Sequence, residues 1–355
     1  MRAYERWPVA GSAASMRSST VMVNAPPSAT DEAVRGDALL HLVAEQLVAN
    51  DELRAHGRGM PGPGVVSIDK IRRGRARTVQ LSPHAHTVDP GSWAGPVSLR
   101  VHPLPAPDAI YLHVHGGGFV MGSSTQHDVA LADLGRSANV EVISVDYRLA
   151  PEFPFPVGRN DVGAAVSFAL DEAQNRGLVG VIVGAESAGA NHALGAVVEL
   201  GIESLVGRGL LGLSLSFGFF DLGLSVGARK WGEEYLVLNT PWLDWFATQY
   251  LPGVSPSARS DALYSPVYTD LRGLPPTQLI VGTLDPLLDD SLLLHESLCR
   301  SGVDVTFQSF PEAPHGFLAM PTKMGRAGMS MIGDWIKERT KAQPVPDTMT
   351  RWVER

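Results

Sequence analysis

Short apolar runs alternate with helix-length segments along most of this chain. Near-continuous apolar strands separated by helices are typical of a mostly parallel sheet that is covered on both faces. The pattern therefore predicts an α/β fold with a mostly parallel central sheet. Its strands are expected at residues 97–101, 109–114, 140–145, 179–183, 210–214, 278–281 and 303–307.

The N-terminal part of the chain does not follow this alternation. Residues 31–55 place apolar side chains at helical spacing behind Asp31 and Glu32, which predicts one or two helices before the main domain. Residues 1–30 are rich in Ser, Ala, Gly and Pro, so we expect a disordered leader there.

A dense group of aromatic side chains interrupts the alternation between residues 217 and 264, where a simple α/β fold needs only one crossover. The rings have two interpretations. They pack this insertion onto the core, or they belong to a cap whose inner face lines an apolar substrate pocket, and both can hold for different residues. The group comprises Trp231, Tyr235, Trp242, Trp245, Phe246 and Tyr250.

Composition and charge narrow the class of protein. The 355 residues include 29 Lys plus Arg against 37 Asp plus Glu, a formal net charge of −8, and the single Cys299 excludes an internal disulfide framework. An acidic, 44% hydrophobic chain is typical of a soluble globular protein and argues against nucleic acid as a partner. The most continuously apolar uncharged stretch, 209–220, is far shorter than the ~20 residues of a spanning helix. We therefore expect no membrane insertion and a cytoplasmic location.

Ser187 is the candidate nucleophile. It follows the apolar strand at 179–183 and precedes a helical run at 190–200, so it lies at a strand-to-helix turn of the nucleophile-elbow type. Such a turn is crowded, and the neighbours of the serine are small, although Ala185 stands where glycine is usual. The alternative is an ordinary serine near a helix start.

Three consecutive glycines follow the strand at 109–114, within the segment 115–119, His-Gly-Gly-Gly-Phe. Backbone amides that no side chain shields can converge on one point and form an oxyanion hole. The alternatives are a flexible loop or a phosphate loop, but the Lys-Ser/Thr of a nucleotide loop is missing. Together with the serine turn, the glycines favour the oxyanion hole.

A nucleophilic serine needs a base, and three histidines follow Ser187 in the chain. His192 lies one turn into the helix behind the serine, and His295 lies mid-helix among leucines, so both are interpreted as packing or surface residues. His315 follows the strand at 303–307 in a loop held by Pro and Gly. It is the predicted base.

The acid that orients the base is expected between the serine and the histidine in the chain. Asp285 is the first carboxylate after the strand at 278–281, which favours it. Asp289 and Asp290 would begin the next helix, where they are interpreted as capping and dipole partners.

From about residue 102 to 340 the chain resembles the hormone-sensitive-lipase family of α/β-hydrolases, the bacterial esterase and lipase group. The resemblance implies the α/β-hydrolase fold, with a mostly parallel sheet of about eight strands, helices on both faces and a helical cap. It implies Ser187, Asp285 and His315 as catalytic residues and the amides of Gly117, Gly118 and Ala188 as oxyanion donors. The matching segments are 115–119 (HGGGF), 146–152 (DYRLAPE), 154–156 (PFP), 186–189 (ESAG), 285–287 (DPL) and 315–317 (HGF).

The resemblance also implies a division of the chain. Residues 31–60 and the insertion 217–264 contribute to the cap, and residues 61–216 and 265–345 form the catalytic domain. Two departures from the family pattern, Ala185-Glu186 and Asp289-Asp290, bear on substrate range and rate, and Arg148 is expected to brace loops by binding a carboxylate. The predicted substrate-binding residues are Phe119, Glu186, Trp231, Trp242, Trp245 and Phe246.

These features predict a serine carboxylesterase that hydrolyses small to medium carboxylic esters through an acyl-enzyme, with no metal or organic cofactor. The same catalytic residues could serve an amidase, a lactonase or a carbamate hydrolase, because the substrate pocket selects the leaving group. A non-catalytic small-molecule receptor on this fold is a further alternative, although such a protein typically lacks the base. The partner is a small-molecule ester, and a homodimer is left open.

Overall fold

The computed structural model describes residues 39, 41–58, 62–63, 70–71 and 80–341. The expected leader at 1–30 lies outside these residues. Of the helical region predicted at 31–55, residues 31–38 and 40 also lie outside them. What is described of that helix is α2 (Val43–Gly57). No helix of the described residues is long and apolar enough to cross a membrane.

An eight-stranded sheet forms the centre of the molecule, in the order β1-β2-β4-β3-β5-β6-β7-β8. β1 pairs with β2, and β2 with β4, in antiparallel fashion, whereas all further pairs are parallel. This confirms the mostly parallel sheet. The strands are β1 (His86–Val88), β2 (Leu99–His102), β3 (Ala109–Val114), β4 (Val140–Val145), β5 (Val181–Glu186), β6 (Leu210–Ser216), β7 (Thr277–Leu284) and β8 (Val305–Pro314).

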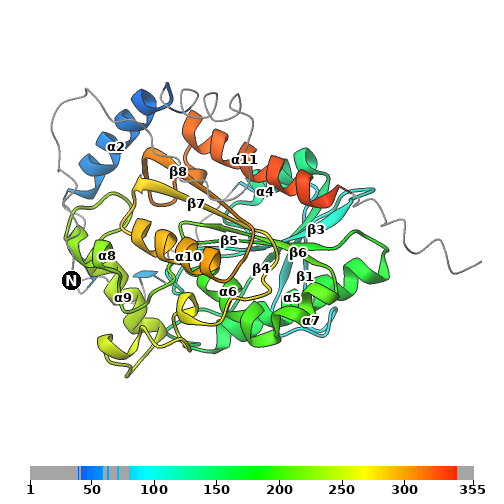
Figure 1. Cartoon of the computed structure of the whole chain (residues 1–355). Coiled ribbons are helices and arrows are strands. Elements are labelled where there is room, and N and C mark those ends of the chain that lie inside the picture. The colour runs from blue at the N-terminus through cyan, green and yellow to red at the C-terminus, as the bar shows by residue number, and fades with distance from the viewer. Residues whose placement is uncertain (1–38, 40, 59–61, 64–69, 72–79, 342–355) are drawn as a thin grey trace, which may run out of the picture.

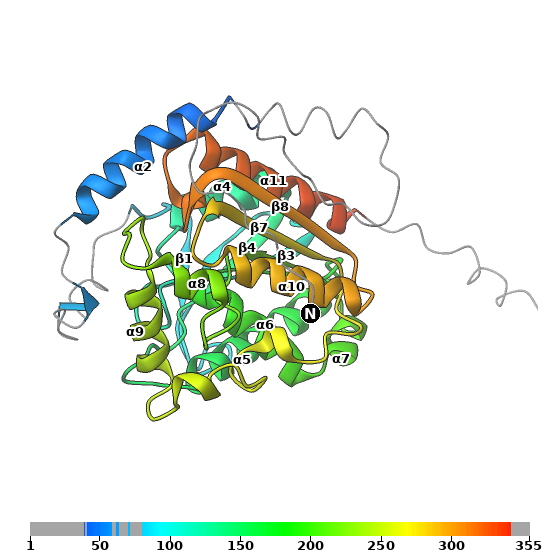
Figure 2. The same ribbon diagram turned by 60° about the vertical axis from the view of Figure 1, so that its left-hand side comes forward.

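Helices cover both faces of the sheet (Figures 1 and 2). Strands β3 and β4 are buried along their whole length, which explains their continuous apolar runs. One face is covered by α5 (Val157–Asn175), α6 (Ala188–Leu200), α7 (Ile202–Gly207) and α10 (Leu288–Arg300), and the other by α4 (Asp128–Ala138) and α11 (Lys323–Thr340).

Strand β8 is longer than the sequence predicts, since it continues from residue 307 to Pro314. The prediction stopped early because Pro311 and Pro314 read as loop residues. Proline is tolerated here because β8 is an edge strand, which pairs only with β7 among the strands that the structure describes. The extra length brings the chain directly to His315, which is followed by the 3₁₀ turn η4 (Phe317–Ala319).

The segment between β6 and β7 rises above the carboxyl ends of the strands and carries short helices. In this segment the ring of Tyr250 stacks on the ring of Phe119, which follows β3. The ring centroids are 4.0 Å apart and the angle between the ring planes is 4°. Arg54 of α2 binds Glu234 of this segment at 3.0 Å, so the N-terminal helix touches it too. The helices are α8 (Val226–Trp231), α9 (Thr240–Tyr250), η2 (Pro256–Ala258) and η3 (Pro266–Tyr268).

Candidate active site

Ser187 lies at a sharp turn between β5 and α6. Its backbone has φ +51° and ψ −123°, a conformation that residues other than glycine rarely adopt. The turn fits because Gly189 lacks a side chain: a Cβ atom there would come 2.4 Å from the carbonyl oxygens of Val114 and His115. This strain and crowding are typical of a nucleophile elbow. Ala185, which stands where glycine is usual, is buried at the turn with 3% of its surface exposed.

His315 connects Ser187 to Asp285. Its Nε2 lies 2.9 Å from the Oγ of Ser187, and its Nδ1 lies 2.9 Å from the Oδ2 of Asp285. With the Nδ1 proton donated to the carboxylate, Nε2 can accept the proton of the serine hydroxyl. The structure therefore brings together all three residues that the sequence singled out.

Asp285 is held in place from its own turn. The residue directly follows β7, and its Oδ1 accepts the N–H of Leu287 at 2.8 Å. Asp285 is 2% exposed and His315 7%, and the ring of Phe217 meets the imidazole edge-on at 5.0 Å. The hydrogen bonds between them are therefore shielded from water.

The glycine loop after β3 presents unpaired amides beside the serine. The N–H groups of Gly117, Gly118 and Ala188 have no acceptor among the residues that the structure describes. The carbonyl of Gly117 accepts the N–H of Met121 at 2.8 Å, which turns the loop back on itself. Buried donors without an acceptor are rare, so these amides are available for a ligand oxygen.

The two other histidines after the serine lie away from this constellation. His192 is 1% exposed and packs edge-on against the rings of Phe119, Tyr147 and Tyr250. His295 lies on α10, with its ring 5.0 Å from that of Phe307. Both are packing residues, as the sequence indicates.

Glu186 has a different setting from the one expected. Its Oε1 accepts the N–H of Gly116 at 3.2 Å and lies 2.6 Å from the Nε2 of His127. Burial raises the pKa of Glu186, but the His127 imidazolium and the Gly116 N–H outweigh burial and hold the pKa well below its ordinary value. The lowered pKa of Glu186 and the raised pKa of His127 both favour the ionic form of the pair, and this carboxylate is already engaged by the protein.

His127 is a site residue that sequence reasoning missed. Burial lowers its pKa, but the attraction of Glu186 is stronger and raises the pKa above the ordinary value. The residue directly precedes α4 and belongs to no segment that the motif analysis singled out. Only its partnership with Glu186, 59 residues further along the chain, reveals it.

The predicted aromatic substrate-binding residues have different surroundings. Phe246 covers the glycine loop, because a Cβ atom on Gly118 would come 2.4 Å from its ring. Trp242 and Trp245 flank that ring at 5.6 and 5.5 Å between centroids. The indole of Trp231 instead donates to the carbonyl of Glu234 within its own turn.

The structure corrects the capping role of the two aspartates after Asp285. The N-terminus of α10 has Leu287 as its cap residue, with no side-chain capping bond. Asp289 accepts the N–H of Gly227 at 2.6 Å, and Asp290 accepts the N–H groups of Phe220 and Asp221 at 2.8 Å each. Both carboxylates therefore accept hydrogen bonds from the backbone of the segment between β6 and β7, because this segment passes over the start of α10.

Arg148 makes the carboxylate contact that was expected of it. Its guanidinium binds Asp161 through two nitrogens, at 2.6 Å from Nη2 and 2.9 Å from Nε. Asp161 is fully buried on α5. The pair joins the segment after β4 to that helix beneath the site, which confirms the bracing role.

Comparison with known proteins agrees with this geometry. Residues 111–319 match the family model described as alpha/beta hydrolase fold. An acetyl esterase from Salmonella schwarzengrund is 30% identical over 228 residues, which cover 63% of this chain and 70% of the relative. The solved Pyrobaculum calidifontis esterase is 26% identical with a TM-score of 0.70 over 82% of this chain and 98% of that one. An esterase of the bacterial hormone-sensitive lipase family is 26% identical with a TM-score of 0.67, over 83% and 98%.

A mostly parallel sheet with a Ser–His–Asp constellation at the carboxyl ends of its strands is typical of a serine hydrolase of the α/β class. This chain belongs to the α/β-hydrolase fold family. Among solved structures it is similar to an esterase of the bacterial hormone-sensitive-lipase family. It is an ester-hydrolysing enzyme, a serine carboxylesterase.

Proposed function

We propose that Ser187 is the nucleophile, His315 the general base and acid, and Asp285 the residue that orients the imidazole. Ser187 attacks the ester carbonyl while its proton passes to Nε2 of His315. The protonated His315 then gives that proton to the departing alcohol, which leaves an acyl-enzyme. A water molecule, deprotonated by the same nitrogen, releases the acid and regenerates the serine.

The oxyanion of each tetrahedral intermediate is held by the amides of Gly117, Gly118 and Ala188. The observation that carries this proposal is the position of His315, 2.9 Å from both Ser187 and Asp285, next to three amides that have no acceptor among the described residues. Such preorganised donors cost no reorganisation as the negative charge develops.

The substrates are small carboxylic esters, with acetyl esters foremost. Two observations support this choice. The ring of Phe246 closes over Gly118, which limits the room beside the oxyanion amides. The relative from Salmonella schwarzengrund is named an acetyl esterase. The segment 217–264 and α2 act as the cap that sets this limit, and Phe119, Trp242 and Trp245 support its inner face.

The cytoplasm is the proposed location, and the substrates are soluble esters rather than lipid surfaces. The acidic net charge of −8 supports this choice, because it disfavours anionic membranes. A homodimer stays a prediction, which light scattering on the purified chain would test.

The test is hydrolysis of p-nitrophenyl esters from acetate to dodecanoate by the wild type, by Ser187→Ala and by the control Ser297→Ala on α10. We expect turnover that is highest at short acyl chains, at least 10³-fold lower in Ser187→Ala and unchanged in the control. A fluorophosphonate probe should label the wild type and not Ser187→Ala. Retention of most activity in Ser187→Ala would refute the proposal.

Matched esters, lactones and anilides then separate the related activities. The proposal expects the ester to be turned over fastest at equal acyl size. Faster turnover of the anilide or the lactone would identify an amidase or a lactonase with the same nucleophile. Labelling by the probe without turnover of any of them would point to a hydrolase with a narrow substrate range, whereas neither labelling nor turnover would point to a receptor.

A further inference from the structure

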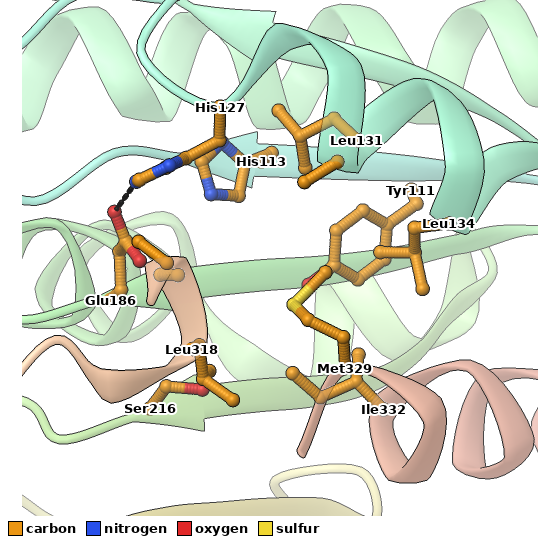
Figure 3. A pocket seen from close by; sticks show the side chains of 13 residues that line it. Tyr111, His113, His127, Leu131, Leu134, Glu186, Ser216, Leu318, Met329 and Ile332 are labelled. Atoms are coloured by element: carbon orange, nitrogen blue, oxygen red, sulfur yellow. Dashed lines mark hydrogen bonds and ion pairs between the residues drawn. The ribbon is translucent and has the colours of Figure 1, made fainter. Parts of the chain in front are cut away.

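Glu186 joins three segments that are far apart in the sequence. It is the last residue of β5 and the neighbour of Ser187, and its carboxylate contacts Gly116 of the glycine loop and His127 at the start of α4. Figure 3 shows the carboxylate turned toward His127, at one end of a pocket between the sheet and helices α4 and α11. One side chain therefore ties together the serine turn, the oxyanion loop and a covering helix.

The surroundings of this ion pair strengthen it. The Glu186 side chain is 13% exposed and that of His127 17%. Apart from the pair, Tyr111, His113 and Ser216, the pocket is lined by apolar side chains, among them Leu131, Leu318 and Met329. An ion pair attracts more strongly in such low-dielectric surroundings than in water. The bond from the N–H of Gly116 is charge-assisted, because its acceptor is a carboxylate whose lowered pKa favours the ionised form.

The position of Gly116 determines where the next two amides point. The loop consists of glycines, and Gly117 and Gly118 have φ of +121° and +61°, so the backbone itself restricts it little. A Cβ atom on Gly116 would come 3.1 Å from the Cβ of Ser187, which shows how closely the loop lies against the serine turn. The N–H of Gly116 is held by Glu186 alone among the described residues.

We propose that Glu186, supported by His127, is a positioning residue for the oxyanion hole. It holds the amide of Gly116 so that the amides of Gly117 and Gly118 face the oxygen of the carbonyl group that Ser187 attacks. The role differs from the substrate contact that the sequence predicts for Glu186, because the carboxylate is engaged by the protein. The inference rests on the proposed function, since it takes those two amides as the oxyanion donors.

The test compares Glu186→Leu, which removes the acceptor, with Glu186→Asp, which keeps the charge. A pure positioning effect on the oxyanion lowers kcat and leaves KM nearly unchanged. We expect Glu186→Leu to lower kcat on p-nitrophenyl acetate about 10- to 100-fold, with KM within about twofold. Glu186→Asp should recover a substantial part of that loss, because a shorter carboxylate still attracts Gly116.

A second readout separates positioning from damage to the fold. The affinity for a trifluoromethyl ketone, which forms an oxyanion adduct with the serine, should fall by the same factor as kcat/KM in Glu186→Leu. The affinity for p-nitrophenol, the alcohol product, should stay within twofold, because it has no acyl oxygen to bind the oxyanion amides. His127→Leu should also lower kcat, and the double variant should lose no more than the worse single variant, because both act through one contact.

Asp128→Asn is the matched control. Asp128 begins α4, directly after His127, and its buried ion pair is with Arg100 of β2, not with the glycine loop. The substitution should lower stability while kcat stays within threefold. Unchanged kcat in Glu186→Leu, or an equal kcat loss in Asp128→Asn, overturns the inference. Full activity of Ser187→Ala would instead refute the proposed function, so the two failures are distinct.

Discussion

Phe246 of α9 lies against Gly118 so closely that a Cβ atom on residue 118 would come 2.4 Å from the Cγ of the ring. The contact joins the segment between β6 and β7 to the loop that carries the proposed oxyanion donors. Because Phe246 is 5% exposed and flanked by two indoles, its ring is fixed rather than free to swing aside. A single side chain therefore limits the space beside the amide of Gly118, one of the proposed oxyanion donors.

Phe246→Ala is expected to shift the preferred acyl chain to greater length. Removal of the ring opens space beside Gly118, so the ratio of kcat/KM for hexanoate over acetate should rise about tenfold. Such a change in kcat/KM is typical of one or a few methylene groups bound in an apolar pocket. Stability should fall by about 3 kcal/mol, because a buried ring is lost. The measurement is the p-nitrophenyl ester series, assayed well below the midpoint of thermal unfolding.

Trp231→Ala provides the control for this change, because its indole bonds within its own turn. Its acyl-length profile should match that of the wild type. An unchanged profile in Phe246→Ala would show that the ring does not border the acyl site.

Two inactive variants of the nucleophile should differ in stability. Ser187 has φ +51° and ψ −123°, which glycine adopts at little cost and alanine does not. Ser187→Gly is therefore expected to be more stable than Ser187→Ala by about 1 kcal/mol. Urea unfolding of both variants checks this. Equal stabilities would mean that the turn relaxes once the hydroxyl is gone.

Local chemistry explains how much of the fold could be predicted. Strands β3 and β4 were predicted with their observed ends because they are buried on both sides, so their apolar runs end where burial ends. Strand β1 was missed, since His86 and Thr87 are exposed and form no apolar run. Its pairing with β2 is a tertiary contact with no periodic signal.

The candidate site shows the same division. Ser187, Asp285 and His315 could be found because each follows a strand at a turn with its own local signature. His127 could not, because its partner Glu186 is brought near by the parallel alignment of β3 and β5. The partners of Asp290 also escaped prediction, since the backbone of Phe220 and Asp221 reaches it across the fold.

Asp285→Asn should nearly abolish turnover while the fold persists. The amide can still accept the N–H of Leu287, but it can present N–H to Nδ1 and so favour the wrong tautomer of His315. We expect kcat on p-nitrophenyl acetate to fall about 10³- to 10⁴-fold. Circular dichroism should stay as in the wild type. Asp289 accepts the N–H of Gly227 instead, so Asp289→Asn should keep kcat within a few-fold of the wild type. A larger loss of kcat in Asp289→Asn than in Asp285→Asn would assign the role of the acid to Asp289.

Asp290 makes the stability of the enzyme depend on pH. The carboxyl is buried on α10, and burial, together with the nearby charge of Asp221, raises its pKa from 3.8 to about 7, although two backbone N–H groups and Ser225 oppose the shift. Between about pH 4 and pH 7 the folded state therefore holds a proton that the unfolded state has lost. Stability must fall as pH rises through this window, because the folded state binds more protons.

Asp290→Asn is expected to remove this dependence. An uncharged amide oxygen can still accept the N–H groups of Phe220 and Asp221 and never bears the buried charge. Denaturant unfolding at pH 5 and pH 8 measures the effect as the stability of the variant minus that of the wild type, which cancels the other titrating groups. This difference should grow by about 3 kcal/mol from pH 5 to pH 8, because the folded-state carboxyl, with its pKa of about 7, titrates about two units above pH 5 and one pKa unit corresponds to about 1.4 kcal/mol. A constant difference for Asp290→Asn would mean that Asp290 is ionised throughout.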